Sequence, residues 1–165
     1  MNALPRLLFV LVLVVVGVVV GTTALALPPE VASHFGSSGQ ADGWMPRAGY
    51  TALVVALSTL LPLLVACTSG LLPRITRLHK LVRHPDYWLE PARREAAQAF
   101  LANHACALGI LLSLFMLGVH LLTLQANAAQ PARLALGPFF ALLGVFLALL
   151  VVWIVTLRLR FRMPG

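Results

Sequence analysis

The residues best suited to chemistry or recognition lie in one polar stretch, at positions 28–49, between two long apolar runs. It holds an imidazole, a carboxylate, a guanidinium and two aromatic rings, at His34, Phe35, Asp42, Trp44 and Arg47. One histidine with one or two carboxylates falls short of the ligand set of a metal site. We therefore interpret these five residues as a surface that binds a ligand or partner, with no metal and no cofactor.

Within this stretch, short extended pieces flank a Gly-Ser-Ser-Gly turn at positions 36–39. Glycine and serine at these places favour a tight turn, which predicts a small hairpin or compact loop. We expect Asp42 to bond Arg47 or nearby backbone amides and so close the loop, with His34 beside the carboxylate. We expect the two aromatic rings to pack at the helix ends.

The elements that must position this stretch are four apolar runs, at positions 7–27, 50–72, 99–124 and 134–157, none of which contains a charged residue. The first run would rise ~31 Å as a helix, enough to cross the hydrocarbon core of a bilayer. Charged residues make up only 10 % of the chain, against a usual ~25 %. Because lipid satisfies no backbone hydrogen bonds, such runs form helices. The sequence predicts an all-α integral membrane protein, a single membrane domain of four transmembrane helices with a small extracytoplasmic loop cap between the first two.

The first run has a second interpretation, as a secretory signal. Arg6 precedes it, and residues 24–26, Ala-Leu-Ala, have the small-x-small form of a cleavage site. The apolar run is longer than the usual 7–15 residues of a signal, which favours a retained helix.

The basic residues divide unequally between the two sides of the predicted membrane. Ten of the twelve lie on the side of the termini and the 73–98 loop, together with three of the five acidic residues, so this face holds the whole net charge of +7. The positive-inside rule makes it the cytoplasmic face. We expect a multi-pass protein of the bacterial inner membrane with both termini in the cytoplasm.

The cytoplasmic loop 73–98 is interpreted as an anchor at the membrane surface. Its basic residues recur every third position, as in an amphipathic interfacial helix, and two amphipathic aromatic residues follow, giving the set Arg74, Arg77, Lys80, Arg83, Tyr87 and Trp88. The expected partners are the bilayer and its anionic lipid headgroups. Nucleic acid is not expected, since no aromatic platform or reading motif accompanies the charge.

Small and weakly polar residues form stripes on the helices, as in faces along which membrane helices associate. The third helix has Cys106, Gly109, Ser113, Met116, His120, Thr123 and Asn127, and the fourth has Gly137, Ala141, Gly144 and Ala148. We expect both stripes to pack against other helices. His104 and His120 are expected to form interhelical hydrogen bonds, and Pro62 predicts a kink because it cannot donate to the Ser58 carbonyl.

The loop motif resembles a bacterial family, domain of unknown function 1648. The matching residues are Leu27, Pro28, His34, Phe35, Gly39, Asp42, Gly43, Trp44 and Arg47, while Gly36 stands where the family commonly has Asn. The resemblance covers about the first 65 residues. It extends distantly to a membrane immunity and signalling protein of a sporulation-delaying toxin system, which is longer and has further helices.

The resemblance implies a sensor, immunity-like or accessory protein, whose partner is a ligand, another protein or a second copy of the chain. No CxxC, HExxH or phosphate-binding glycine loop occurs in the sequence, so we do not expect an enzyme. The alternative function is a small transporter or channel component. Against it, the spans contain no acidic or basic residue of the kind that lines ion paths.

The predicted sidedness can be tested by cysteine labelling on intact cells, after Cys67 and Cys106 are replaced. A cysteine at Ser37 should react with an impermeant thiol reagent, and one at Ala92 should not. The opposite labelling pattern would overturn the topology.

Overall fold

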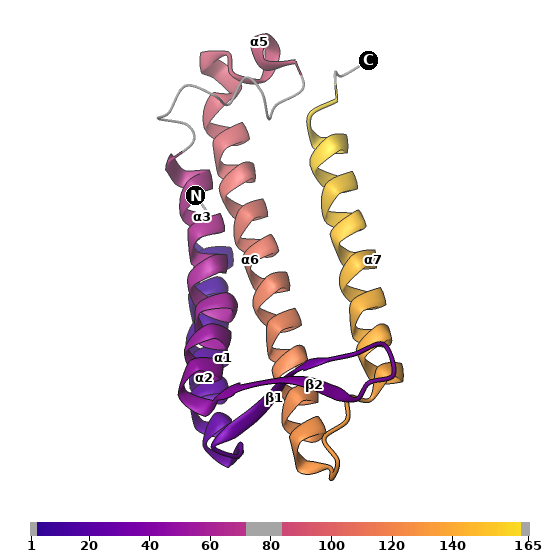
Figure 1. Ribbon diagram of the computed structural model, residues 1–165. Coiled ribbons are helices and arrows are strands. Elements are labelled where there is room, and N and C mark those ends of the chain that lie inside the picture. The colour runs from indigo at the N-terminus through magenta and orange to yellow at the C-terminus, as the bar shows by residue number, and fades with distance from the viewer. Residues whose placement is uncertain (1–2, 72–83, 163–165) are drawn as a thin grey trace.

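The computed structural model describes residues 3–71 and 84–162 and consists mainly of long helices (Figure 1). The elements in chain order are α1 (Leu4–Thr23), the 3-10 turn η1 (Ala24–Ala26), strands β1 (Glu30–Phe35) and β2 (Ala41–Pro46), α2 (Arg47–Val55), the π-helical turn η2 (Ala56–Leu60), α3 (Leu61–Leu71), α5 (Pro85–Trp88), α6 (Pro91–Ala128) and α7 (Leu136–Arg160). α2, η2 and α3 follow one another without a break.

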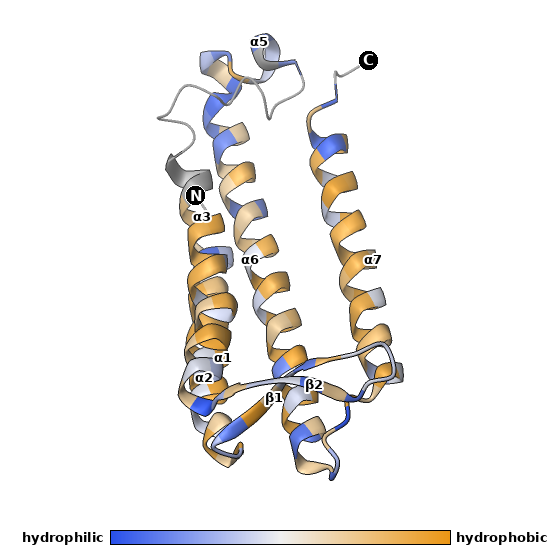
Figure 2. Ribbon diagram, viewed as in Figure 1, coloured by the Kyte–Doolittle hydropathy of each residue, from blue (hydrophilic) through white to orange (hydrophobic). Residues whose placement is uncertain are grey.

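Successive long helices run in opposite directions, with the β1–β2 hairpin at one end of the bundle (Figure 1). α5, the start of α1 and the end of α7 lie toward the other end (Figure 1). Apolar residues cover most of the length of α1, α3 and α7 (Figure 2). Within residues 3–71 and 84–162, four helical segments are long and apolar enough to cross a membrane. The predicted class is confirmed: this is a mainly helical, multi-pass membrane protein, and its cap is a two-stranded antiparallel sheet.

The helix boundaries differ from the predicted spans, most of all in the third helix. α6 begins at Pro91 instead of 99 and ends at Ala128 instead of 124, because the polar residues before position 99 are mostly good helix formers. At 38 residues it rises ~57 Å, almost twice the hydrocarbon thickness. The predicted loop at 73–98 is therefore partly helical. Its basic residues Arg74, Arg77, Lys80 and Arg83 lie outside the described residues.

α6 is the central helix of the bundle. It packs against α1, η2, α3 and α7, and its predicted stripe faces inward, with Cys106, Gly109, Ser113, His120 and Thr123 buried. A Cβ at Gly109 would lie only 2.5 Å from Cε2 of the buried Phe9. The absence of a side chain at 109 thus allows α1 to lie directly on α6, as expected for membrane helices.

The prediction for the fourth helix is wrong. Gly137, Ala141, Gly144 and Ala148 are all exposed. α6 uses its stripe for α1 and α3, so α7 meets α6 through larger residues instead. The Phe146 ring stacks on Phe115, with 4.4 Å between ring centroids.

Pro62 lies in the second membrane-spanning helix and leaves the Ser58 carbonyl without its usual helical hydrogen bond. The kink expected at Pro62 stays a prediction, but the helix departs from regular α geometry at the π-helical turn η2, which ends two residues before the proline. Without an N–H, Pro62 cannot donate to the Ser58 carbonyl. The Ser113 hydroxyl of α6 donates to that oxygen at 2.7 Å. Both serines are fully buried, so this bond joins two helices at a point where a backbone acceptor would otherwise lie in an apolar interior.

Replacing Ser113 with Ala should lower the free energy of unfolding in mixed detergent micelles by about 1 kcal/mol. The control is Thr156→Val, which removes a hydroxyl that bonds within its own helix at Trp153 O and should cost little. In a Pro62→Ala background the cost of Ser113→Ala should shrink, because an N–H at 62 can donate to Ser58. Equal costs for Ser113→Ala and Thr156→Val would contradict this account.

Candidate functional site

The polar stretch predicted to carry function forms the β1–β2 hairpin. The strands pair with Val31 opposite Met45 and Ala32 opposite Trp44, and the register shifts twice toward the tip. The Gly39 N–H donates to Gly36 O at 2.8 Å and closes the turn. Gly39 has φ +80°, and a Cβ there would lie 2.6 Å from Leu134 O, so both the turn and a close backbone contact need glycine.

The base of the hairpin is fixed by Arg47. Its Nη1 donates to Leu25 O at 3.1 Å and Leu27 O at 3.0 Å, where the chain leaves η1. Its backbone N–H donates to Pro29 O at 2.8 Å. Carbonyls beyond the last turn of a helix lack helical partners, and the guanidinium supplies donors for two of them. Arg47 is therefore a structural clamp, and the expected bond between Asp42 and Arg47 is wrong.

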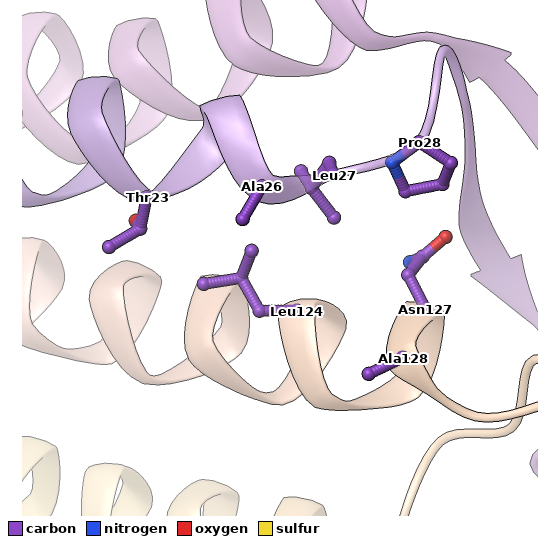
Figure 3. A pocket seen from close by; sticks show the side chains of 7 residues that line it. All are labelled: Thr23, Ala26, Leu27, Pro28, Leu124, Asn127 and Ala128. Atoms are coloured by element: carbon purple, nitrogen blue, oxygen red, sulfur yellow. The ribbon is translucent and has the colours of Figure 1, made fainter.

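The middle of the hairpin is fixed by Asn127, near the end of α6 (Figure 3). Its Nδ2 donates to Ala32 O at 3.0 Å, and its Oδ1 accepts from the Ala32 N–H at 2.8 Å. The side-chain amide thus pairs with β1 as a neighbouring strand would. An unpaired strand edge presents a row of free backbone groups, and Asn127 covers one donor and one acceptor of that row.

The tip of the hairpin is fixed by the loop between α6 and α7. The Leu134 N–H donates to Gly39 O at 2.8 Å, and the Ala41 N–H donates to Ala132 O at 3.3 Å. The sequence did not predict this contact, which joins residues more than 90 positions apart. The sequence near the tip offered only Gly39 as a clue. Glycine tolerates a positive φ and so suits any turn, which does not identify the partner of the tip.

The predicted His34, Asp42 and Trp44 have exposed side chains on the hairpin. His34 Nδ1 pairs with Asp42 Oδ1, and the two side chains are 76 % and 52 % exposed, so the expected placement of His34 beside this carboxylate is confirmed. Trp44 is 57 % exposed. Because side chains alternate along a strand, Trp44 shares its face with Asp42 and points away from the bundle. The expectation that Trp44 packs at the helix ends is wrong.

Phe35 faces the bundle, as expected. It is half-buried and lines a cavity with Leu122 of α6 and Leu136 of α7. The five predicted residues therefore divide into an exposed set (His34, Asp42 and Trp44), a ring that faces the bundle (Phe35) and a clamp (Arg47). Among the residues that the structure describes, no cluster of three or more histidine, cysteine or acidic residues could hold a metal ion.

A buried polar centre lies beneath the hairpin, around His120. The Thr23 hydroxyl donates to Val19 O at 2.5 Å, so the Thr23 oxygen accepts from His120 Nε2–H at 2.9 Å. The other nitrogen, Nδ1, then accepts from the Tyr50 hydroxyl at 3.0 Å. His120 has no exposed surface. The predicted interhelical role of His120 is confirmed, and the centre links α1, α2 and α6. The stripe pattern identified His120, but nothing in the sequence singled out Tyr50.

His104 joins α6 to α7 at the end of the bundle away from the hairpin. His104 Nε2 donates to Trp153 O at 2.9 Å, and Trp153 Nε1 donates to His104 O at 2.8 Å. The two rings stack, with 4.5 Å between centroids. The predicted interhelical role of His104 is thus confirmed as well.

The predicted surface residues Tyr87 and Trp88 lie near the ends of α6 and α7. The Arg93 guanidinium lies 3.8 Å from the Tyr87 ring centroid, and that of Arg160 lies 4.6 Å from the Trp88 ring. Trp88 also meets the Phe161 ring edge-on. These cation–π and aromatic contacts close this end of the bundle.

The N-terminal part of the chain, which includes the hairpin, matches a protein family. Residues 7–59, from α1 through the hairpin to η2, match the family model described as "Domain of unknown function (DUF1648)". The resemblance predicted from the loop motif is confirmed. No curated protein and no solved structure matches the chain.

Proposed function

We propose, from the match of residues 7–59 to the domain of unknown function 1648, that this protein is a non-enzymatic sensor, immunity-like or accessory protein of the bacterial inner membrane. Its recognition surface is the outer face of the β1–β2 hairpin. The hairpin faces the outside and both termini face the cytoplasm, as the distribution of basic residues favours. The basic residues of the opposite end lie at anionic lipid headgroups.

The observation that supports this proposal most is the contrast between the backbone of the hairpin and its outer side chains. The backbone is hydrogen-bonded at its base, middle and tip, by Arg47, Asn127 and Leu134. The side chains of His34, Asp42 and Trp44 are nonetheless exposed. A linker needs neither such fixation nor an exposed tryptophan. A binding surface gains affinity from a fixed backbone, because the hairpin is already ordered before the partner arrives. It gains affinity from an exposed tryptophan through the contacts that the ring makes with the partner.

The outer face also has the chemistry of recognition. Charged pairs at the surface set specificity and association rate, and an exposed tryptophan is a frequent anchor of protein interfaces. Asp42 and His34 offer hydrogen bonds beside Trp44, a combination that suits a polypeptide partner with both polar and apolar groups.

The packing of the bundle favours this proposal over a transporter or channel. A polar path through the membrane needs polar side chains with free hydrogen-bonding groups. Both ring nitrogens of His120 are bonded to neighbouring helices, and the Ser113 hydroxyl is bonded to Ser58 O. All of these groups contribute to a packed interior.

The proposal is tested by placing a photo-crosslinking amino acid at the exposed Gln40 in intact cells. We expect a discrete protein adduct that falls about tenfold or more in Asp42→Asn and Trp44→Ala, since losing a hydrogen bond to a charged group costs about 1.5–3 kcal/mol. Glu30→Gln changes an exposed carboxylate of the same hairpin outside the His34–Asp42 pair and serves as the control.

Protein abundance in the membrane should be equal in all variants, because the changed side chains are exposed. An adduct that is unaffected by both Asp42→Asn and Trp44→Ala, or that falls equally in Glu30→Gln, would contradict a recognition role for this face.

A further inference from the structure

A cavity of about 380 Å³ lies under the tip of the hairpin, between α6 and α7. Its volume is in the range of small-molecule sites. The wall is mainly apolar and comes from three elements. β1 contributes Phe35, α6 contributes Val119 and Leu122, and α7 contributes Leu136, Phe139 and Phe140. The α6 and α7 residues belong to helices that are apolar enough to span a membrane. When these helices cross a bilayer, the lower part of this cavity lies on the side of the acyl chains.

The upper rim of the same cavity is polar. Ser33, His34 and Ser37 line it from the hairpin. Beside the rim is Arg133, an exposed residue whose Nη2 donates to Ser38 O at 3.4 Å. In the described part of the chain no carboxylate forms a salt bridge with Arg133. The site thus has an apolar floor at membrane depth, a hydroxyl-rich rim and an unneutralised cation above it.

α7 is covered less by the rest of the bundle than the other long helices. None of its residues is buried. Directly below the cavity, Leu142 of α7 packs against Gly118 of α6, where a Cβ would lie 2.8 Å from Leu142 Cδ2. About one turn farther along, the Phe146 ring stacks on Phe115. The cavity is thus bounded below by these contacts and opens to the surface beside Phe140, which is 60 % exposed.

We propose that this cavity binds one phospholipid of the surrounding bilayer, with an acyl chain against its apolar wall and the phosphate at Arg133. The match is one of polarity and charge: the apolar wall fits the chain, the hydroxyls of Ser33 and Ser37 fit the ester region, and the guanidinium fits the phosphate. Such a lipid would complete the packing of α7 and support the hairpin from below. This inference does not depend on a partner at the outer face.

The test uses the full chain in nanodiscs that contain phosphatidylglycerol with a photoreactive group in its acyl chain. Adducts should concentrate at residues 119–123 and 134–140, at least fivefold above the exposed face of α7 at 151–155. Leu122→Trp, which fills the cavity, should lower these adducts about tenfold. Leu121→Trp changes the neighbouring, exposed residue of α6 and should not.

Arg133→Gln provides a second, surface variant that leaves the bundle core unchanged, and it should lower the same adducts severalfold, whereas Glu30→Gln should not. Adducts spread evenly over all exposed helix faces would show bulk lipid only and overturn the proposal. So would equal effects of Leu122→Trp and Leu121→Trp, or adducts between two protein chains at residues 134–140. The Gln40 crosslink to a protein partner is a separate readout, so failure of either proposal is distinguishable.

Discussion

The pairing of the Asn127 side chain with the Ala32 peptide is the interaction on which the outer end of the protein depends. One amide group at the end of the central helix supplies a donor and an acceptor to β1. This fixes the strand over α6, and the hairpin register then decides which side chains point outward. Phe35 is directed into the bundle, while Asp42 and Trp44 are presented away from it.

The same principle recurs at membrane depth, where backbone and side-chain polar groups have no water to bond. The Ser113 hydroxyl satisfies the carbonyl that Pro62 leaves free, and His120 joins Thr23 and Tyr50. Each bond connects different helices. These hydrogen bonds therefore stabilise the bundle, and they also satisfy polar groups that lipid would leave without a partner. The hairpin is therefore attached to a bundle in which hydrogen bonds join α6 to α1, α2 and η2.

Much of the architecture could be predicted from the sequence, because its causes are local. Long runs without charge predict helices in lipid, and the stripe on the third helix correctly predicts the burial of Ser113 and His120. The failures have a common cause in long-range contacts. Nothing near Arg47 shows that it would clamp Leu25 and Leu27, nor that residues 132–134 would meet the hairpin tip. The exposed stripe on α7 shows that small residues predict close packing only where a partner helix is available.

The most direct test of a fixed hairpin is the hydrogen exchange rate of the Ala32 amide, measured by NMR in detergent micelles. We expect slow exchange in the unmodified chain and acceleration of about fivefold or more in Asn127→Ala, because one hydrogen bond contributes about 1 kcal/mol. Gln125→Ala, at an exposed position of the same helix, should leave the rate unchanged. An Ala32 amide that exchanges as fast as a free peptide, or that is unaffected by Asn127→Ala, would contradict the account.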